Sequence, residues 1–187
     1  MKSNNTEHTV APLPALIPAS HNAQSAHVLE RGNAETSPFH IKHILVPIDF
    51  SDCSRKAIKY ALPLATQFNA TLTLLHVADF EKEPPASQNP DSHVPEAQLL
   101  HNYQNHLHQW AKDEIRDTVA CETLVWKGNA VSDIIAAAKS RHADLIIIST
   151  KGESGHKESV LGTTTERVVR HAPCPVLVVR EKEHDFV

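Results

Sequence analysis

Short apolar runs alternate with segments of helical periodicity along residues 40–181, and this alternation constrains the fold more than any other feature of the sequence. The run 44–48 is apolar throughout, as expected for a strand that is buried on both faces of a sheet. Comparable strands are predicted at 72–77, 122–126, 145–148 and 176–179. Each predicted strand is therefore separated from the next by a helical segment.

Apolar residues in the intervening segments recur every three or four positions, which is typical of amphipathic helices. Ser51 is a plausible N-cap for the first helix, which ends in a turn at 69–70. The second helix has its apolar stripe over 100–115, and two further helices are predicted around 134–138 and over 163–171. Because strand and helix alternate throughout, the sequence predicts one doubly wound α/β domain. Its sheet should be mostly parallel, with helices on both faces.

The remaining parts of the chain lack this periodicity. Residues 1–38 bury too little to offset their ordering entropy and are predicted to be a disordered N-terminal tail, although a patch at 13–18 can instead dock on a neighbouring surface. Residues 39–182 are predicted to form the folded domain, and 183–187 a C-terminal tail. The segment 81–95 carries four prolines and is interpreted as a long loop, either a flap or a disordered insertion.

Charge and cysteine content argue against several functional classes. The formal net charge of −4 gives no general attraction to nucleic acid or to an anionic membrane surface. No stretch approaches the roughly 18 to 20 apolar residues of a membrane span, and no secretory signal pattern opens the chain. The three cysteines are widely spaced and contain no Cys-x-x-Cys pair, which argues against disulfides and structural zinc. We therefore expect a cytoplasmic protein with reduced thiols that binds neither nucleic acid nor membranes.

Two groups of side chains suggest other chemistry, and both have plainer interpretations. His101, His106 and His108 lie on one predicted helix, but their spacing is wrong for metal ligands on adjacent turns. They are interpreted as solvated histidines, and no metal site is predicted. Cys53 lies at a predicted helix N-terminus, where the helix dipole can make a thiol reactive. A packing role is favoured over a redox role, because no resolving cysteine is adjacent in the sequence.

The segment 149–165, which follows the fourth predicted strand, has the composition of a phosphate-binding loop. Glycines let backbone N–H groups approach an anion closely, and Gly162 opens a helix whose N-terminal dipole favours phosphate. The hydroxyls of Thr163 and Thr165 can add donors. This segment and Asp49 both follow the carboxyl ends of strands, where doubly wound sheets bind ligands. Composition alone also fits an ordinary surface loop, and the pattern is neither a Walker A motif nor a dinucleotide fingerprint.

The same segment resembles the nucleotide loop of the universal stress protein family, which reads glycine, two residues, glycine, nine residues, then glycine and Ser or Thr. Gly152 and the pair Gly162-Thr163 match that spacing, whereas Ser149 stands in the place of the first glycine. The resemblance covers about 40–181. It includes segments similar to the family's opening strand, fourth strand and closing segment, at 43–51, 143–148 and 170–179.

The resemblance implies the fold of that family, an adenine nucleotide alpha hydrolase-like, five-stranded parallel sheet. It also implies ATP as the ligand, with Mg²⁺ as an optional companion, and a homodimer made by pairing the last strands at 176–179. Asp49 would hold the adenine side of ATP, and Val77 would line the adenine pocket. The ribose and phosphates would be held by Gly152, Gly162, Thr163 and Thr165. The implied nucleotide-binding set also includes Pro47, Ser149 and Thr164.

These assignments have alternatives that the sequence leaves open. Asp49 can cap the first helix, Val77 can be an ordinary strand residue, and the threonines can be N-caps. Ser149 costs on the order of 1 kcal/mol if its position needs a positive φ, but it can add a hydroxyl donor if the position needs only a small residue. Another branch of the family lacks the glycine loop and does not bind ATP, so Ser149 bears on which branch the chain resembles.

No catalytic residue is predicted. A kinase or hydrolase would need a positioned base or nucleophile and carboxylates for magnesium, and the charged residues of the loop are interpreted as solvated. The protein is therefore expected not to be an enzyme, with ATP turnover slow and incidental. Two functional hypotheses remain. The favoured one is an ATP-binding stress-response protein that acts as a dimeric, nucleotide-dependent switch on a regulatory protein partner. The other is a nucleotide-independent dimeric interaction or chaperone-like protein.

Overall fold

The computed structural model describes residues 40–80, 95–150, 162–182 and 184. The predicted tail 1–38, nearly all of the predicted loop 81–95, and Gly152 lie outside these residues, as does most of the predicted C-terminal tail. Interpretations of those segments stay predictions.

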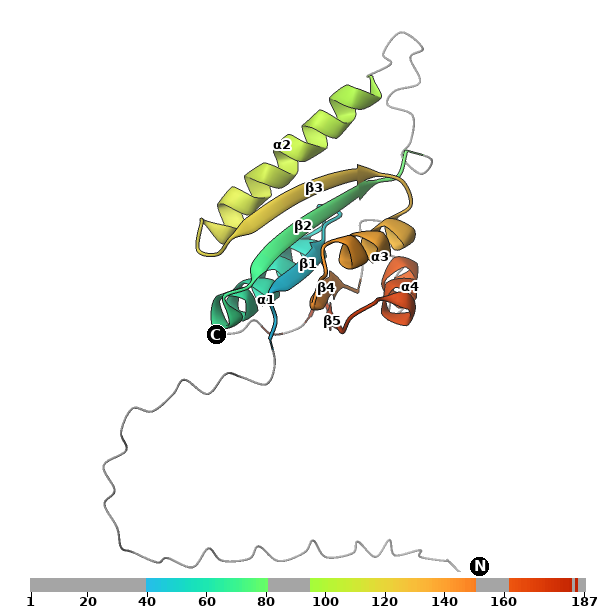
Figure 1. Cartoon of the computed structure of the whole chain (residues 1–187). Coiled ribbons are helices and arrows are strands. Elements are labelled where there is room, and N and C mark those ends of the chain that lie inside the picture. Colours follow the sequence, from blue (N-terminus) through green and yellow to red (C-terminus); the bar gives the residue numbers. More distant parts are fainter. Residues whose placement is uncertain (1–39, 81–94, 151–161, 183, 185–187) are drawn as a thin grey trace, which may run out of the picture. The chain divides into compact units, whose positions relative to one another are not determined.

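Five parallel strands form a single sheet in the order β3-β2-β1-β4-β5 (Figure 1). The strands are β1 (His43–Pro47), β2 (Thr71–Ala78), β3 (Cys121–Lys127), β4 (Leu145–Ser149) and β5 (Val176–Val179). From β1 the chain proceeds outward to β2 and β3 on one side, and it then returns to β4 and β5 on the other. The strand order therefore reverses between β1 and β4, the place where doubly wound sheets bind ligands.

Within the described residues, four helices cover the two faces of this sheet: α1 (Asp52–Phe68), α2 (Glu96–Ile115), α3 (Ala130–Ser140) and α4 (Thr163–His171). One core cluster joins the sheet to α1 and α2, and a second joins it to α3 and α4. Successive side chains of a strand point to opposite faces, so β1 supplies both cores. This arrangement confirms the predicted five-stranded parallel sheet with helices on both faces.

The ends of the helices follow the sequence signals closely. Ser51 is the N-cap of α1, and its side chain accepts a hydrogen bond from the Ser54 N–H. Asn69 ends that helix in the left-handed region at φ 51°, where its N–H donates to the carbonyls of the last turn. Gly162 is the N-cap of α4, which spans the predicted 163–171. Side-chain caps and residues that tolerate positive φ are local signals, so they can be read without the fold.

The helix α2 is amphipathic along its twenty residues. Leu107, Trp110 and Ile115 are buried, whereas His101 and His108 are exposed. These few buried side chains hold α2 against β2 and β3. No helix among the described residues is long and apolar enough to cross a membrane.

Replacing Leu107 by alanine tests how much this packing contributes. Leu107 is completely buried, so Leu107→Ala should lower the free energy of unfolding by about 2–5 kcal/mol through lost burial and a cavity. His108→Ala, one residue further on the exposed side of α2, should change it by less than about 0.5 kcal/mol. Urea denaturation of both variants measures the difference. Equal effects would contradict the described packing of α2.

The three cysteines are free thiols, and two of them have a raised pKa. Burial around the sulfur, followed by the nearby Glu122 carboxylate, raises the pKa of Cys121 to about 11, although the residue as a whole is exposed. Burial and then Asp144 also raise the pKa of Cys174. A raised pKa leaves little thiolate at neutral pH, so neither thiol has the character of a redox centre.

Thiol labelling at pH 8 tests the raised pKa of Cys121. A shift of about two pKa units lowers the thiolate fraction about a hundredfold, and the greater nucleophilicity of a more basic thiolate recovers part of this. In a Cys53→Ser, Cys174→Ser background, Cys121 should react with an aromatic disulfide reagent about tenfold more slowly in the folded protein than in urea. Equal rates would show that the fold does not protect this thiol.

Candidate functional site

The carboxyl ends of β1 and β4 meet at one edge of the sheet. The two strands pair in parallel, with Ile44 opposite Leu145 and Leu45 opposite Ile146. Asp49 follows β1 by two residues, and Ser149 is the last residue of β4. Pro47 is the buried last residue of β1. The sheet thus brings together two predicted positions that are a hundred residues apart in sequence.

Asp49 organises the turn between β1 and α1. Its Oδ1 accepts hydrogen bonds from the Ser51 backbone N–H at 3.1 Å and from the Ser51 hydroxyl at 2.6 Å. The Ser51 Oγ in turn accepts from the Ser54 N–H at 3.1 Å. Asp49 is therefore not itself the cap of α1, because Ser51 caps the helix and Asp49 orients Ser51. Asp49 is half-buried at the carboxyl edge of the sheet, where doubly wound sheets bind ligands.

Hydrogen bonds hold the first turn of α4 against the end of β4. The Gly162 N–H donates to the Thr150 carbonyl at 2.7 Å, and the Thr165 hydroxyl donates to the Ser149 carbonyl at 2.7 Å. The Thr150 N–H donates to Val179 of β5 at 2.9 Å. The first two bonds satisfy the carbonyls at the end of β4 and hold the start of α4 there, and the third joins Thr150 to β5.

Gly162 is required by close approach and not by its backbone angles. Its φ of −63° is accessible to any residue, but a Cβ built at this position would lie 2.9 Å from the Thr150 carbonyl oxygen. The obstacle is backbone, so it cannot swing aside as a flexible side chain would. A larger residue at position 162 would push the N-terminus of α4 away from β4.

The N-terminus of α4 has the properties of an anion site. The first backbone N–H groups of a helix lack intrahelical partners, and the helix dipole adds positive potential there. Thr163 is exposed and Thr164 half-buried, so both are accessible at this end. Thr165 is buried with its hydroxyl donated to Ser149, which leaves its backbone N–H as the group it can offer a ligand.

Two further predicted positions have ordinary strand environments. Ser149 is buried in β4 opposite Val179 and is not among the described non-glycine residues with positive φ. A serine at this position therefore carries no cost from left-handed backbone. Val77 is half-buried in β2 and packs against the core cluster under α3 and α4.

An aromatic cluster is centred on Phe50, the residue after Asp49, and it was not predicted from the sequence. Phe50 stacks on His106 of α2 with ring centroids 4.2 Å apart and planes 6° apart. It also contacts His76 at 4.6 Å, Tyr103 at 6.1 Å and Trp110 edge-on at 5.4 Å. His76 Nδ1 lies 2.8 Å from the Ile48 carbonyl and donates to it. The cluster thus joins the turn after β1 to both β2 and α2.

Phe50 adopts a backbone conformation that costs free energy. Its φ is 62°, in the left-handed region, which costs roughly 1–2 kcal/mol for a residue with a Cβ. Each favourable aromatic pair contributes about 0.5–1.5 kcal/mol beyond burial, so two or more ring contacts can offset that cost. A visible signal existed, because Tyr103, His106 and Trp110 are spaced by three and four residues and so share one face of a helix.

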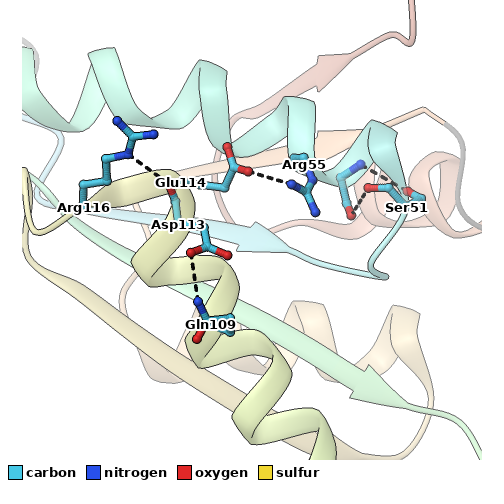
Figure 2. A network of polar contacts seen from close by, with 7 residues as sticks. Ser51, Arg55, Gln109, Asp113, Glu114 and Arg116 are labelled. Carbon is cyan, nitrogen blue, oxygen red and sulfur yellow. Dashed lines mark hydrogen bonds and ion pairs between the residues drawn. The ribbon is translucent and has the colours of Figure 1, made fainter.

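A polar contact joins α1 and α2 beside this cluster. Figure 2 shows Arg55 of α1 reaching Glu114 of α2, with 2.9 Å between Nη1 and Oε1. The Arg55 guanidinium also lies 4.3 Å from the centroid of the Trp110 ring, a cation–π distance. The first turn of α1, which Ser51 caps, is therefore tied to the same helix that carries His106.

Comparison with known proteins gives a consistent family. The model of the universal stress protein family matches residues 40–180. Universal stress protein YxiE of Bacillus subtilis is 32% identical over 145 residues, which is 73% of this chain and 97% of that protein. Universal stress protein MJ0531 of Methanocaldococcus jannaschii is 30% identical over 144 residues, or 77% of this chain and 85% of that protein.

Solved structures have the same fold. Hypothetical protein MJ0577 superimposes with a TM-score of 0.66 and 28% identity, covering 78% of this chain and all of that one. An Archaeoglobus fulgidus universal stress protein in complex with dAMP gives a TM-score of 0.55 at 15% identity, over 75% of this chain and 99% of that one. A universal stress protein in complex with cAMP gives a TM-score of 0.55 at 21% identity, over 76% of this chain and 98% of that one. Since the family match spans most of its length, the chain belongs to the universal stress protein family.

Proposed function

We propose that this universal stress protein binds an adenine nucleotide, ATP in particular, at the carboxyl edge of its sheet and acts as a dimeric, nucleotide-dependent switch. The observation that carries the proposal is the close approach of Gly162 to the Thr150 carbonyl. It brings the N-terminus of α4 to the end of β4, next to the strand that leads to Asp49.

Phosphate and base have complementary groups at this edge. The N–H groups of the first turn of α4, with the helix dipole, suit the phosphates. The Asp49 carboxylate suits the exocyclic amino group of adenine, which is a hydrogen-bond donor. A carboxylate offers about four acceptor positions, so Asp49 can serve Ser51 and a ligand together. Gly152, which lies outside the described residues, belongs to the proposed phosphate contacts on the family motif.

Two of the structural neighbours are complexes with adenine nucleotides. Structures of two universal stress proteins contain dAMP and cAMP, both adenine nucleotides. Both are less than 25% identical to this chain, so they support a shared fold, and the ligand of this chain rests on its own residues. ATP, with Mg²⁺ as a companion of its phosphates, is the specific ligand proposed.

We propose that the protein binds the nucleotide without catalysing its hydrolysis. Phosphoryl transfer needs carboxylates that hold magnesium and a group that positions the nucleophile. Among the described residues at this edge, Asp49 accepts from Ser51, and Glu166 of α4 is paired with Arg170 at 3.0 Å. Among the described residues, no group of three or more His, Cys, Asp or Glu side chains is placed to hold a metal ion. Binding would then act by favouring one conformation or one partner over another.

The dimer is proposed to form through β5. This strand lies at one edge of the described sheet, and Val176, Leu177 and Val178 are half-buried there. An unpaired strand edge is a template for pairing with another chain. The same edge would also support the second candidate function, a dimeric interaction or chaperone-like protein that works without nucleotide. Three free cysteines fit a reducing compartment, so we propose a cytoplasmic location.

Calorimetric titration with magnesium–ATP tests the proposed site. The wild type should bind in the micromolar range, and Gly162→Val should abolish binding because its side chain meets the Thr150 carbonyl. Asp49→Asn keeps one oxygen that can accept from Ser51 but replaces the other oxygen with an amide donor. This variant should therefore weaken the binding of adenine nucleotides more than the binding of GTP. GTP serves as the comparison ligand, and urea denaturation checks that each variant is folded. No binding of ATP, ADP or AMP by the folded wild type would refute the proposal.

The departure from the family's first glycine can be tested by restoring it. Ser149 has ordinary strand geometry, so Ser149→Gly should change ATP affinity by less than about threefold, while costing about 0.5–1 kcal/mol of stability in the strand. The same titration and a urea denaturation measure both effects. A tenfold or larger gain in affinity would mean that the serine side chain obstructs the ligand.

A further inference from the structure

The turn that carries Asp49 is held from two directions. On one side, Asp49 accepts two hydrogen bonds from Ser51, the cap of α1. On the other side, Phe50 has a φ of 62°, and its ring packs at a tilt against His76 of β2 and stacks on His106 of α2. Phe50 is the single residue between Asp49 and Ser51, so the direction of its ring and the position of the carboxylate depend on the same backbone angles.

The contact between Phe50 and His106 is a specific ring stack. The two rings are nearly parallel and 4.2 Å apart, while Trp110 meets both of them edge-on. His106 is nonetheless exposed, in contrast to Leu107 and Trp110, which anchor α2 in the core. Removal of the His106 ring should therefore disturb the turn after β1 more than it disturbs the packing of α2.

We propose that Phe50 and His106 are positioning residues for the nucleotide site: their ring stack holds the Asp49 turn in its binding conformation and couples α2 to the ligand. The inference rests on the proposed function. Phe50 needs no contact with the nucleotide in this role, because it acts through the carboxylate of its neighbour. His106 acts through Phe50 from a helix more than fifty residues further along the chain.

Coupling of this kind is reciprocal. If the stack favours the conformation that binds nucleotide, bound nucleotide must favour the stack by the same factor. Ligand at the sheet edge would therefore reduce the motion of α2 around His106. The ring stack gives the proposed switch a physical route from its ligand to an exposed helix surface.

Three substitutions on α2 test the proposal. His106→Leu removes the ring but keeps an apolar side chain, His106→Phe keeps a flat ring, and His108→Leu makes the matched change at a neighbouring exposed position. Each folded variant is titrated with magnesium–ATP, and amide hydrogen exchange is followed over residues 49–54. Urea denaturation reports stability separately.

His106→Leu should weaken ATP binding roughly three- to tenfold, the range that loss of one aromatic pair supports, and should speed exchange over 49–54. His106→Phe should restore both properties, and His108→Leu should leave them unchanged. Phe50→Leu should weaken binding as well, and combining it with His106→Leu should add little, because both changes break the same contact.

Two results would overturn the inference. One is a His106→Leu variant that loses stability while its ATP affinity and its exchange over 49–54 stay as in the wild type, which is the behaviour of ordinary packing. The other is an equal loss of ATP affinity in His106→Leu and His106→Phe, which would show that the ring is not responsible.

If the wild type binds no adenine nucleotide, the proposed function fails and the nucleotide role of both residues fails with it. Faster exchange over 49–54 in His106→Leu would then identify the stack as a support of the turn alone.

Discussion

Parallel pairing of β1 with β4 is the constraint on which the candidate site depends. These neighbouring strands lie where the strand order reverses, and their carboxyl ends bring Asp49 and Ser149 to one edge. Both strands are buried on the two faces of the sheet, so their position is fixed by two hydrophobic cores. The site gains its geometry from that packing, since the polar groups themselves lie on turns that could not hold a fixed arrangement alone.

The polar contacts of the candidate site serve the fold, and in the proposed function they would also serve the ligand. Asp49 orients the cap of α1, and Thr165 satisfies a carbonyl at the end of β4. If the proposed function holds, a substitution at either residue would therefore change stability and binding together. The sequence left open whether Asp49 has a structural or a ligand-binding role, and these two roles do not exclude each other. A carboxylate with several acceptor positions can fill both roles.

The fold and the helix starts beside the candidate site were predictable because their signals are local. Strand and helix periodicity, the Ser51 cap and the Gly162 helix start were all visible in short windows of sequence, and the structure has them within a few residues of the predicted bounds. The positive φ of Phe50 was not predictable in this way. It depends on rings delivered by β2 and α2, and a phenylalanine in the left-handed region has no sequence signal of its own. His106 was taken for a solvated histidine because its exposure is evident from the helix pattern, whereas its partner is not.

The contacts of Phe50 bear on how the proposed nucleotide switch would transmit binding to the rest of the protein. A ligand shifts a conformational equilibrium only through its different affinity for the two states. The hydrogen bonds described for Asp49 lead through Ser51 to the first turn of α1. Phe50 connects that carboxylate to α2, and Arg55 ties the same helix to α1 through Glu114 and Trp110. The cost of positive φ at Phe50 and the free energy of the ring contacts that offset it are of comparable size, so a ligand that binds two states of this turn with modestly different affinity would be able to shift it.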